Sequence, residues 1–188
     1  MKHLGLIGLV LALMATSAHA STADEIAAID AAKEKKQNEI ATVKRNPVPF
    51  SLKNGITVDL NDYMFVVWIQ QRCEACHRFN PIFKEYSQHL GIKVLPYTLD
   101  GGGDESFPNP IVPRPISEEK LNDPNYDGNE VTKFFGSGMP IASPTLFLVN
   151  VNTGLIYPVT QGLTGMDVVH DRIDLIITTD LTQAVPHG

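Results

Sequence analysis

The hydrophobic pattern of the chain predicts a strand, a helix and a second strand between residues 64 and 99. Residues 64–69 form a short, continuously apolar run of β-branched and aromatic side chains, which is typical of a buried central strand. Residues 92–99 predict the second strand, so this part of the chain begins a βαβ unit. Between them, apolar side chains recur at helical spacing as far as Gly91: Phe79, Ile82, Phe83, Tyr86 and Leu90.

The segments on either side of this unit predict further strands and helices. Upstream, residues 50–60 indicate a hairpin, because Asn54-Gly55 between two apolar stretches is the strongest short-range turn signal. The later elements are a short helix at 129–135, a hairpin of strands at 145–149 and 155–159, and a helix from Thr164 to Ile177.

Residues 1–20 have the pattern of a secretory signal peptide. Lys2 precedes an apolar segment that is too short to span a membrane, and Ala18-His19-Ala20 has the small-x-small pattern of a cleavage site. We therefore expect cleavage after Ala20 and export to an oxidising compartment, where a cysteine pair can be a working disulfide. No later apolar run reaches the length of a membrane span, so we expect no membrane insertion of the mature chain.

Composition divides the rest of the chain into segments. Residues 21–46 are rich in Ala, Lys, Glu and Asp with few large apolar residues, which predicts a solvated helical tether. Residues 47–179 form the predicted folded domain, and residues 180–188 are predicted to be a flexible tail. Inside the domain, residues 100–128 are rich in glycine and proline and form a long insertion, which is either functional or a tolerated surface loop.

The charge of the chain argues against nucleic acid as a partner. The formal net charge is −6 at pH 7 and becomes more negative when Lys2 leaves with the signal peptide. An acidic protein without a basic patch binds nucleic acid poorly, so we expect no nucleic-acid partner.

Cys73 and Cys76 are the only cysteines, and their C-x-x-C spacing places both at the start of the helix that follows the central strand. Unpaired N–H groups at a helix N-terminus favour a thiolate over a thiol. Arg72 and His77 add to this effect, whereas Glu74 opposes it. We therefore predict a moderately activated, exposed nucleophile at Cys73 and a more buried resolving thiol at Cys76.

The same residues allow other interpretations. Cys73 to His77 spell C-x-x-C-H, the attachment signature of a c-type cytochrome, although small cytochromes c are mostly helical. A zinc site would need a fourth ligand, and adjacent Cys76 and His77 point to different sides of a helix. A third alternative is a non-catalytic assembly module in which the disulfide is purely structural.

The order of these elements resembles the thioredoxin fold. The C-x-x-C helix with Pro81 five residues after Cys76, and Ser143-Pro144-Thr145 at the entry to a strand, carry the resemblance over most of the mature chain. It implies an α/β fold with a central mixed sheet flanked by helices, to which this chain adds a helical N-terminal extension and the long Gly/Pro-rich insertion. Within the superfamily, the signal peptide, this extension and this insertion resemble those of the TrbB-like periplasmic thiol-disulfide isomerases of F-type conjugative transfer systems.

The narrower resemblance implies a location, partners and cofactor use. It implies a periplasmic enzyme that forms or corrects disulfides in pilus and mating-pair proteins. An isomerase or reductase of this kind needs a membrane electron donor to keep its dithiol reduced. No cofactor or metal is implied beyond the redox-active Cys73–Cys76 pair.

The resemblance also implies roles for single residues. Pro144 matches the family's cis proline, which faces the C-x-x-C, and Ser143, Pro144 and Thr145 are the expected substrate-binding residues. Thioredoxins carry a buried acid six residues before the first cysteine, and here that position is Val67. Glu74, His77 or solvent is therefore expected to take the place of this acid in proton transfer to and from Cys76, and His77 is equally consistent with a plain surface residue.

Overall fold

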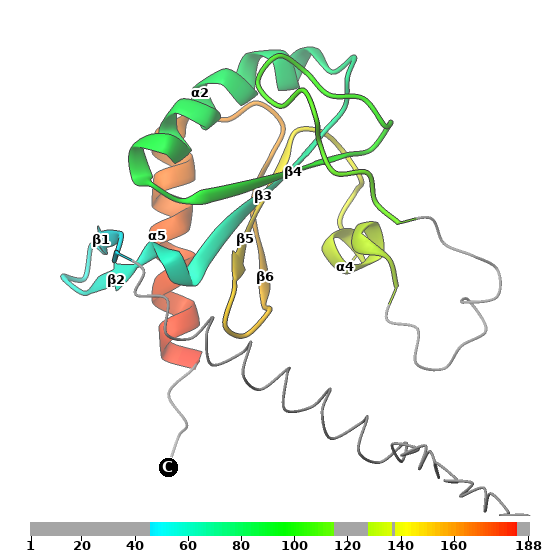
Figure 1. Cartoon of the computed structure of the whole chain (residues 1–188). Coiled ribbons are helices and arrows are strands. Elements are labelled where there is room, and N and C mark those ends of the chain that lie inside the picture. The colour runs from blue at the N-terminus through cyan, green and yellow to red at the C-terminus, as the bar shows by residue number, and fades with distance from the viewer. Residues whose placement is uncertain (1–45, 115–127, 137, 184–188) are drawn as a thin grey trace, which may run out of the picture. The chain divides into compact units, whose positions relative to one another are not determined.

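A computed structural model describes residues 46–114, 128–136 and 138–183 of the 188-residue chain (Figure 1). The chain divides into two compact units between Arg45 and Asn46, and the second contains all the described residues. The expected signal peptide and nearly all of the expected tether lie outside the described residues. In the described part, no helix is both long and apolar enough to span a membrane.

The centre of the fold is a four-stranded mixed sheet in the order β4–β3–β5–β6. β3 (Tyr63–Ile69) pairs in parallel with β4 (Lys93–Thr98) and antiparallel with β5 (Thr145–Asn150). β6 (Ile156–Gln161) completes the sheet as the hairpin partner of β5. The strand predicted from the apolar run at residues 64–69 is therefore central, and both of its faces are buried, as its lack of alternation indicates.

A separate two-stranded hairpin precedes the sheet. β1 (Pro49–Ser51) and β2 (Thr57–Asp59) pair antiparallel, as the Asn-Gly turn predicts. Gly55 has a φ of 86°, in the left-handed region where glycine carries no steric penalty. The short 3-10 helix η1 (Leu60–Asp62) then leads into β3.

Helices cover both faces of the sheet, with α2 (Glu74–Leu90) and α5 (Met166–Gln183) on one and α4 (Glu130–Phe135) on the other (Figure 1). Alternate residues of β3 divide between two cores: Phe65 packs with residues of α2 and α5, whereas Trp68 packs with residues of α4. α2 ends at Gly91 in the left-handed conformation, as predicted from the end of its apolar pattern.

Trp68 is fully buried in the core beneath α4. Its ring stacks on Tyr97 with the centroids 4.9 Å apart, and Phe134 and Phe135 meet it edge-on. The short α4 packs stably on the sheet because its aromatic side chains bury large surfaces there. Trp68 therefore belongs to the core on the α4 side, away from the side that carries α2.

The structure differs from the expected flexible tail at residues 180–183, and the rest of that tail, residues 184–188, lies outside the described residues. α5 continues to Gln183, and Asp180 is only 4% exposed. Its carboxylate accepts hydrogen bonds from Tyr63 Oη at 2.7 Å, Asn150 Nδ2 at 2.6 Å and Tyr157 Oη at 2.5 Å. The prediction of a tail that starts at residue 180 was wrong. Polar contacts stabilise the last turn of α5, and such contacts leave no apolar repeat in the sequence from which the helix could be extended.

The first half of the Gly/Pro-rich insertion packs against the domain. Ile111 forms a parallel bridge with Tyr97 of β4, with Thr98 N donating to Ile111 O at 3.0 Å. Phe107 is buried in the core on the α2 side, and Lys84 of α2 donates to Ser106 O at 2.8 Å. Residues 115–127, which form most of the second half of the insertion, lie outside the described residues.

Candidate active site

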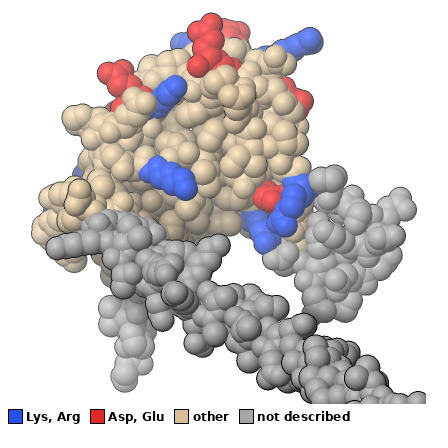
Figure 2. Space-filling view, viewed as in Figure 1, with Lys and Arg blue, Asp and Glu red and all other residues tan. Residues whose placement is uncertain are grey.

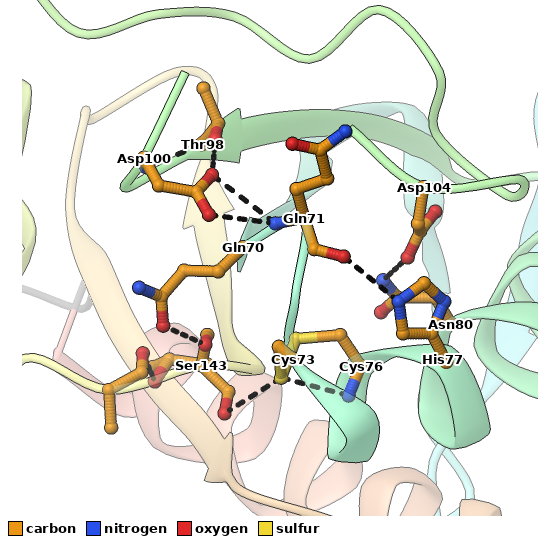
Figure 3. Close-up of a disulfide and its surroundings, with 12 residues drawn as sticks. Gln70, Gln71, Cys73, Cys76, His77, Asn80, Thr98, Asp100, Asp104 and Ser143 are labelled. Carbon is orange, nitrogen blue, oxygen red and sulfur yellow. Dashed lines mark hydrogen bonds between the residues drawn. A yellow bond between two sulfur atoms is a disulfide. The ribbon is translucent and has the colours of Figure 1, made fainter. Parts of the chain in front are cut away.

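The two cysteines lie at the start of α2, shortly after the end of β3, as their spacing predicts (Figure 3). They form a disulfide with Cα atoms 5.1 Å apart. Cys73 is the N-cap of the helix, and its Sγ accepts a hydrogen bond from Cys76 N at 3.0 Å. A sulfur at this position meets the unpaired donors and the positive end of the helix dipole, which stabilise a thiolate in the reduced protein.

The two sulfur positions differ in access. Cys73 is partly exposed, whereas Cys76 is 0% exposed and belongs to the core between the sheet and α2. This is the predicted division between an accessible nucleophile and a buried resolving thiol. An incoming disulfide can reach only Cys73 without movement of the surrounding core.

The loop that enters β5 lies against Cys73. The Ser143–Pro144 peptide bond is cis, as the resemblance implies. Ser143 O is 3.4 Å from Cys73 Sγ. In the disulfide this sulfur carries no hydrogen, so the approach is a contact, and in the reduced thiol the S–H group can donate to the same carbonyl.

Side chains from the residue that follows β3 and from the end of β6 fix this loop. Ser143 Oγ donates to Gln70 Oε1 at 2.6 Å, and Gln161 Nε2 donates to Pro140 O at 2.8 Å. Thr145 is 1% exposed, and its hydroxyl donates to Ala142 O at 2.8 Å. The side chain of Thr145 thus supports the loop from within, contrary to the expectation that it contacts substrate.

Asp100 joins the C-terminal ends of β3 and β4, and sequence reasoning did not single it out. Its carboxylate accepts from Gln71 N at 3.0 Å, Thr98 Oγ1 at 3.0 Å and Gly102 N at 3.1 Å. Burial alone raises the pKa of Asp100, but the hydrogen bonds from Gly102, Thr98 and Gln71 outweigh it and hold this pKa below its usual value. The loop that presents Cys73 is therefore anchored to the neighbouring strand.

The two candidates for proton transfer lie on the exposed side of the first turn of α2. Glu74 and His77 are both exposed. His77 Nε2 is 2.9 Å from Gln71 O, and because a carbonyl only accepts, Nε2 is the protonated nitrogen there. Val67 is 0% exposed, so an apolar side chain occupies the position of the thioredoxin acid. In this structure His77 supports the loop before the cysteines.

A buried polar pair that the sequence did not reveal lies one turn beyond Cys76. Asn80 is 0% exposed, and its Nδ2 donates to Asp104 Oδ2 at 2.5 Å. The other oxygen of Asp104 accepts from Ser106 N at 2.9 Å and Phe107 N at 2.8 Å. Asn80 Oδ1 has no hydrogen-bond partner among the described residues. The pair attaches the insertion to the helix that carries the cysteines.

The geometry of Cys76 and His77 does not favour attachment of a c-type haem. A c-type haem is bonded through both cysteines of its motif, but Cys76 is fully buried and leaves no room for a macrocycle at its sulfur. His77, the axial ligand in that interpretation, is held at Gln71 O. Within the described residues, no group of three or more His, Cys, Asp or Glu side chains is placed to hold a metal ion.

Charge on the surface is mixed. On the face shown in Figure 2, acidic and basic side chains are interspersed, and no continuous basic surface is visible. One ion pair on the described surface joins Arg114 Nε to Glu130 Oε1 at 2.7 Å, and a second joins Lys53 to Asp171 at 2.8 Å.

Comparisons with solved structures find thioredoxin-like proteins. The chain is similar to the thioredoxin domain of a thiol-disulfide oxidoreductase from Bacteroides vulgatus, with 16% identity, 70% of this chain and 94% of that chain covered, and a TM-score of 0.34. It is also similar to the exposed lipoprotein thioredoxin Etrx1 from Streptococcus pneumoniae, with 14% identity, 71% and 99% covered, and a TM-score of 0.35. The strand order, the C-x-x-C at the start of α2 and the cis-proline loop in this structure are themselves those of a thioredoxin-like fold.

Sequence comparisons identify the family. The chain is 35% identical over 175 residues to the protein TrbB of Escherichia coli strain K12, with 89% of each chain covered. Residues 60–174 match the model of the family described as "TraF: F plasmid transfer operon protein". These residues contain β3, α2, the cis-proline loop and the first half of α5. The chain is therefore a TrbB-like, thioredoxin-fold member of the TraF family of F plasmid transfer operon proteins.

Proposed function

We propose that this protein is a periplasmic thiol-disulfide oxidoreductase, and that it acts as an isomerase or reductase on cysteine-containing proteins of a conjugative transfer apparatus. One observation carries the proposal: an accessible Cys73 at the N-terminus of α2 lies 3.4 Å from the carbonyl that precedes a cis proline, with Cys76 buried behind it. The similarity to TrbB of Escherichia coli supports the choice of conjugation proteins as substrates.

The reaction begins at the Cys73 thiolate. It attacks one sulfur of a substrate disulfide, so that a Cys73–substrate disulfide forms and the second substrate sulfur leaves as a thiolate, which takes a proton from solvent. The substrate segment beside the new bond lies along Ser143 and Pro144. The Ser143 carbonyl is in place to accept a hydrogen bond from a backbone N–H of that segment.

Two outcomes are available to the mixed disulfide. In isomerisation, another substrate thiolate attacks the substrate sulfur, which forms a different substrate disulfide and returns Cys73 as a thiolate without net electron transfer. In reduction, the Cys76 thiolate attacks Cys73 Sγ, which forms the Cys73–Cys76 disulfide and releases the substrate as a thiol. Reduction delivers two electrons to the substrate. A membrane dithiol donor must then supply two electrons to the Cys73–Cys76 disulfide to reduce the enzyme again.

The surroundings of Cys76 favour isomerisation over rapid reduction. Cys76 is fully buried, and the apolar Val67 takes the place of an acid that could accept its proton. Burial in apolar surroundings disfavours the charged thiolate. A slowly formed Cys76 thiolate leaves the mixed disulfide more time to react with a substrate thiol.

Refolding of a scrambled multi-disulfide protein tests the proposal. We expect the reduced mature protein to accelerate recovery of the native pairing, the Cys73→Ser variant to have no activity, and the Cys76→Ser variant to retain isomerase activity and accumulate a mixed disulfide. If the variant lacking both cysteines retained the biological activity, the protein would instead be an assembly module with a structural disulfide.

The reduction potential of the Cys73–Cys76 pair then tests the direction of electron flow. A value near about −200 to −270 mV is expected for an isomerase or reductase that a partner keeps reduced, whereas about −120 mV would indicate a disulfide donor. The intact mass of protein exported to a periplasm excludes haem attachment if no mass is added, and an added haem would overturn the proposal.

A further inference from the structure

Gln70 connects the two loops of the site. Its backbone carbonyl accepts from Cys73 N at 3.3 Å, and its side-chain Oε1 accepts from Ser143 Oγ at 2.6 Å. Ser143 O in turn contacts Cys73 Sγ at 3.4 Å. The three residues form a closed ring of contacts between the end of β3, the start of α2 and the cis-proline loop (Figure 3).

The oxygen and the nitrogen of the Gln70 amide differ in their hydrogen bonding. Oε1 is bonded to Ser143, and Nε2, which carries two N–H groups, makes no hydrogen bond to another described residue. Gln70 is only partly buried, and Figure 3 shows its amide oxygen pointing to Ser143 and its amide nitrogen pointing away from the disulfide. Among the described residues this donor therefore has no partner, and it belongs to a side chain that contacts the loop where we expect substrate to bind.

We propose that Gln70 is a substrate-binding residue that recognises extended polypeptide, with its Nε2–H donating to a main-chain carbonyl of the segment that flanks the substrate cysteine. This inference rests on the proposed function, because it assigns a substrate class to the same site. A main-chain carbonyl is present in every extended segment, so the contact selects unfolded or loosely folded protein without selecting a sequence. A small disulfide that lacks a peptide backbone makes no such contact.

The Ser143 contact makes this donor effective. Because Ser143 holds Oε1, the amide plane is oriented before substrate binds, and little side-chain freedom is lost on binding. A neutral hydrogen bond of this kind contributes roughly a two- to tenfold preference. We therefore expect the contribution of Gln70 to appear with peptide disulfides and to be absent with small disulfides.

The Gln70→Glu variant tests the donor separately from the acceptor. A glutamate keeps an oxygen for Ser143 Oγ but has no N–H to donate. Gln71→Glu is the matched control, because it places the same charge on the next residue, whose side chain is exposed and makes no contact with Ser143. The rates of attack on a disulfide-linked extended peptide and on bis(2-hydroxyethyl) disulfide are measured for both variants and the unsubstituted protein.

We expect Gln70→Glu to slow the reaction with the peptide several-fold more than the reaction with the small disulfide, and Gln71→Glu to slow both equally. If Gln70→Glu also slowed both substrates equally, Gln70 would act only through the charge or position of the loop, and the proposal would be overturned. Absence of reaction with either substrate in the unsubstituted protein would instead contradict the proposed function.

A binding measurement keeps the inference testable without turnover. In the Cys73→Ser protein, a cysteine-free extended peptide is titrated while the side-chain Nε2 resonances of Gln70 are followed by NMR. We expect these resonances to shift together with the backbone amide of Ser143. Peptide binding that shifts Ser143 but leaves the Gln70 side-chain resonances in place would contradict the assignment.

Discussion

Cys73 Sγ lies 3.4 Å from the carbonyl oxygen of Ser143, a residue 70 positions later in the chain. The contact exists because β3 and β5 are neighbours in the sheet, so that the end of β3 and the entry to β5 meet at one edge. The first supplies the reacting sulfur and the second supplies backbone groups for a substrate. The chemistry of the site therefore depends on strand order as well as on the C-x-x-C motif.

The two cysteines should differ in their rates of alkylation. In the reduced protein at neutral pH, we expect iodoacetamide to modify Cys73 well before Cys76, because Cys73 is partly exposed at a helix N-terminus and Cys76 is fully buried. Peptide mass spectrometry of samples quenched over time measures both rates. Faster modification of Cys76 would reverse the assigned roles.

Asp180 should be a major determinant of stability. The Asp180→Ala variant leaves the buried donors of Tyr63 and Asn150 and the partly buried donor of Tyr157 without an acceptor, and we expect a loss of about 3 kcal/mol in the free energy of unfolding. Urea unfolding measures it. Asp171→Ala is the control, because the Asp171–Lys53 pair is exposed to solvent and should contribute little to stability. Equal losses in the two variants would contradict a special role for Asp180.

The same cluster predicts a loss of stability at alkaline pH. Burial, together with the hydrogen bond to Asp180 and its negative charge, raises the pKa of Tyr157 to about 12. A folded-state pKa above the unfolded value of about 10 means that stability is complete below pH 10 and falls as the pH rises towards about 12. Urea unfolding at several pH values should show this fall, and Tyr157→Phe should make it shallower. An unchanged slope in the variant would exclude Tyr157 as a cause.

The sequence predicted the elements that have a repeating apolar signal. Burial determines the continuous apolar run in β3 and the spaced apolar residues of α2 as far as Gly91. Each of these elements therefore has a local pattern that can be recognised in the sequence. The cis peptide before Pro144 was expected only from the family resemblance, because the isolated tripeptide favours a trans proline that starts an edge strand.

The polar contacts of the fold could not be predicted in the same way. Asp180 and Tyr63 are 117 positions apart, and Gln70 and Ser143 are 73 apart. A hydrogen bond between distant side chains leaves no periodicity in either segment, so only the tertiary structure reveals which polar residues meet. For this reason the extent of α5 was underestimated and the role of Gln70 was missed.

Asp104 should hold the insertion on α2. We expect Asp104→Ala to cost about 1–3 kcal/mol, because Asn80 Nδ2 and two backbone N–H groups lose their acceptor. The amides of Ser106 and Phe107 should then exchange with solvent faster, which hydrogen-exchange NMR measures residue by residue. The neighbouring Glu105→Ala is the control, since Glu105 is exposed. Unchanged exchange at both amides would show that Phe107 packing alone holds the segment.

Gln161 should affect activity through the cis-proline loop. Its Nε2 donates to Pro140 O at 2.8 Å and to Thr145 Oγ1 at 3.1 Å, so Gln161→Glu would place a carboxylate against two oxygen atoms in place of a donor. The loop should loosen and the Ser143 carbonyl should lose its fixed position beside Cys73. A loss of about 1 kcal/mol in the positioning of substrate corresponds to a roughly fivefold lower kcat/KM with a peptide disulfide.

The Gln161→Leu variant separates loosening of the loop from the effect of charge. It removes both hydrogen bonds without adding a charge, so kcat/KM should still fall with the peptide, while the pH dependence of Cys73 alkylation should stay that of the unsubstituted protein. If instead the alkylation profile shifted to higher pH in Gln161→Glu alone and Gln161→Leu reacted normally, the effect would be electrostatic. The loop would then not need Gln161 to hold Ser143 against the reacting sulfur, and the contacts from β3 through Gln70 would be sufficient to position it.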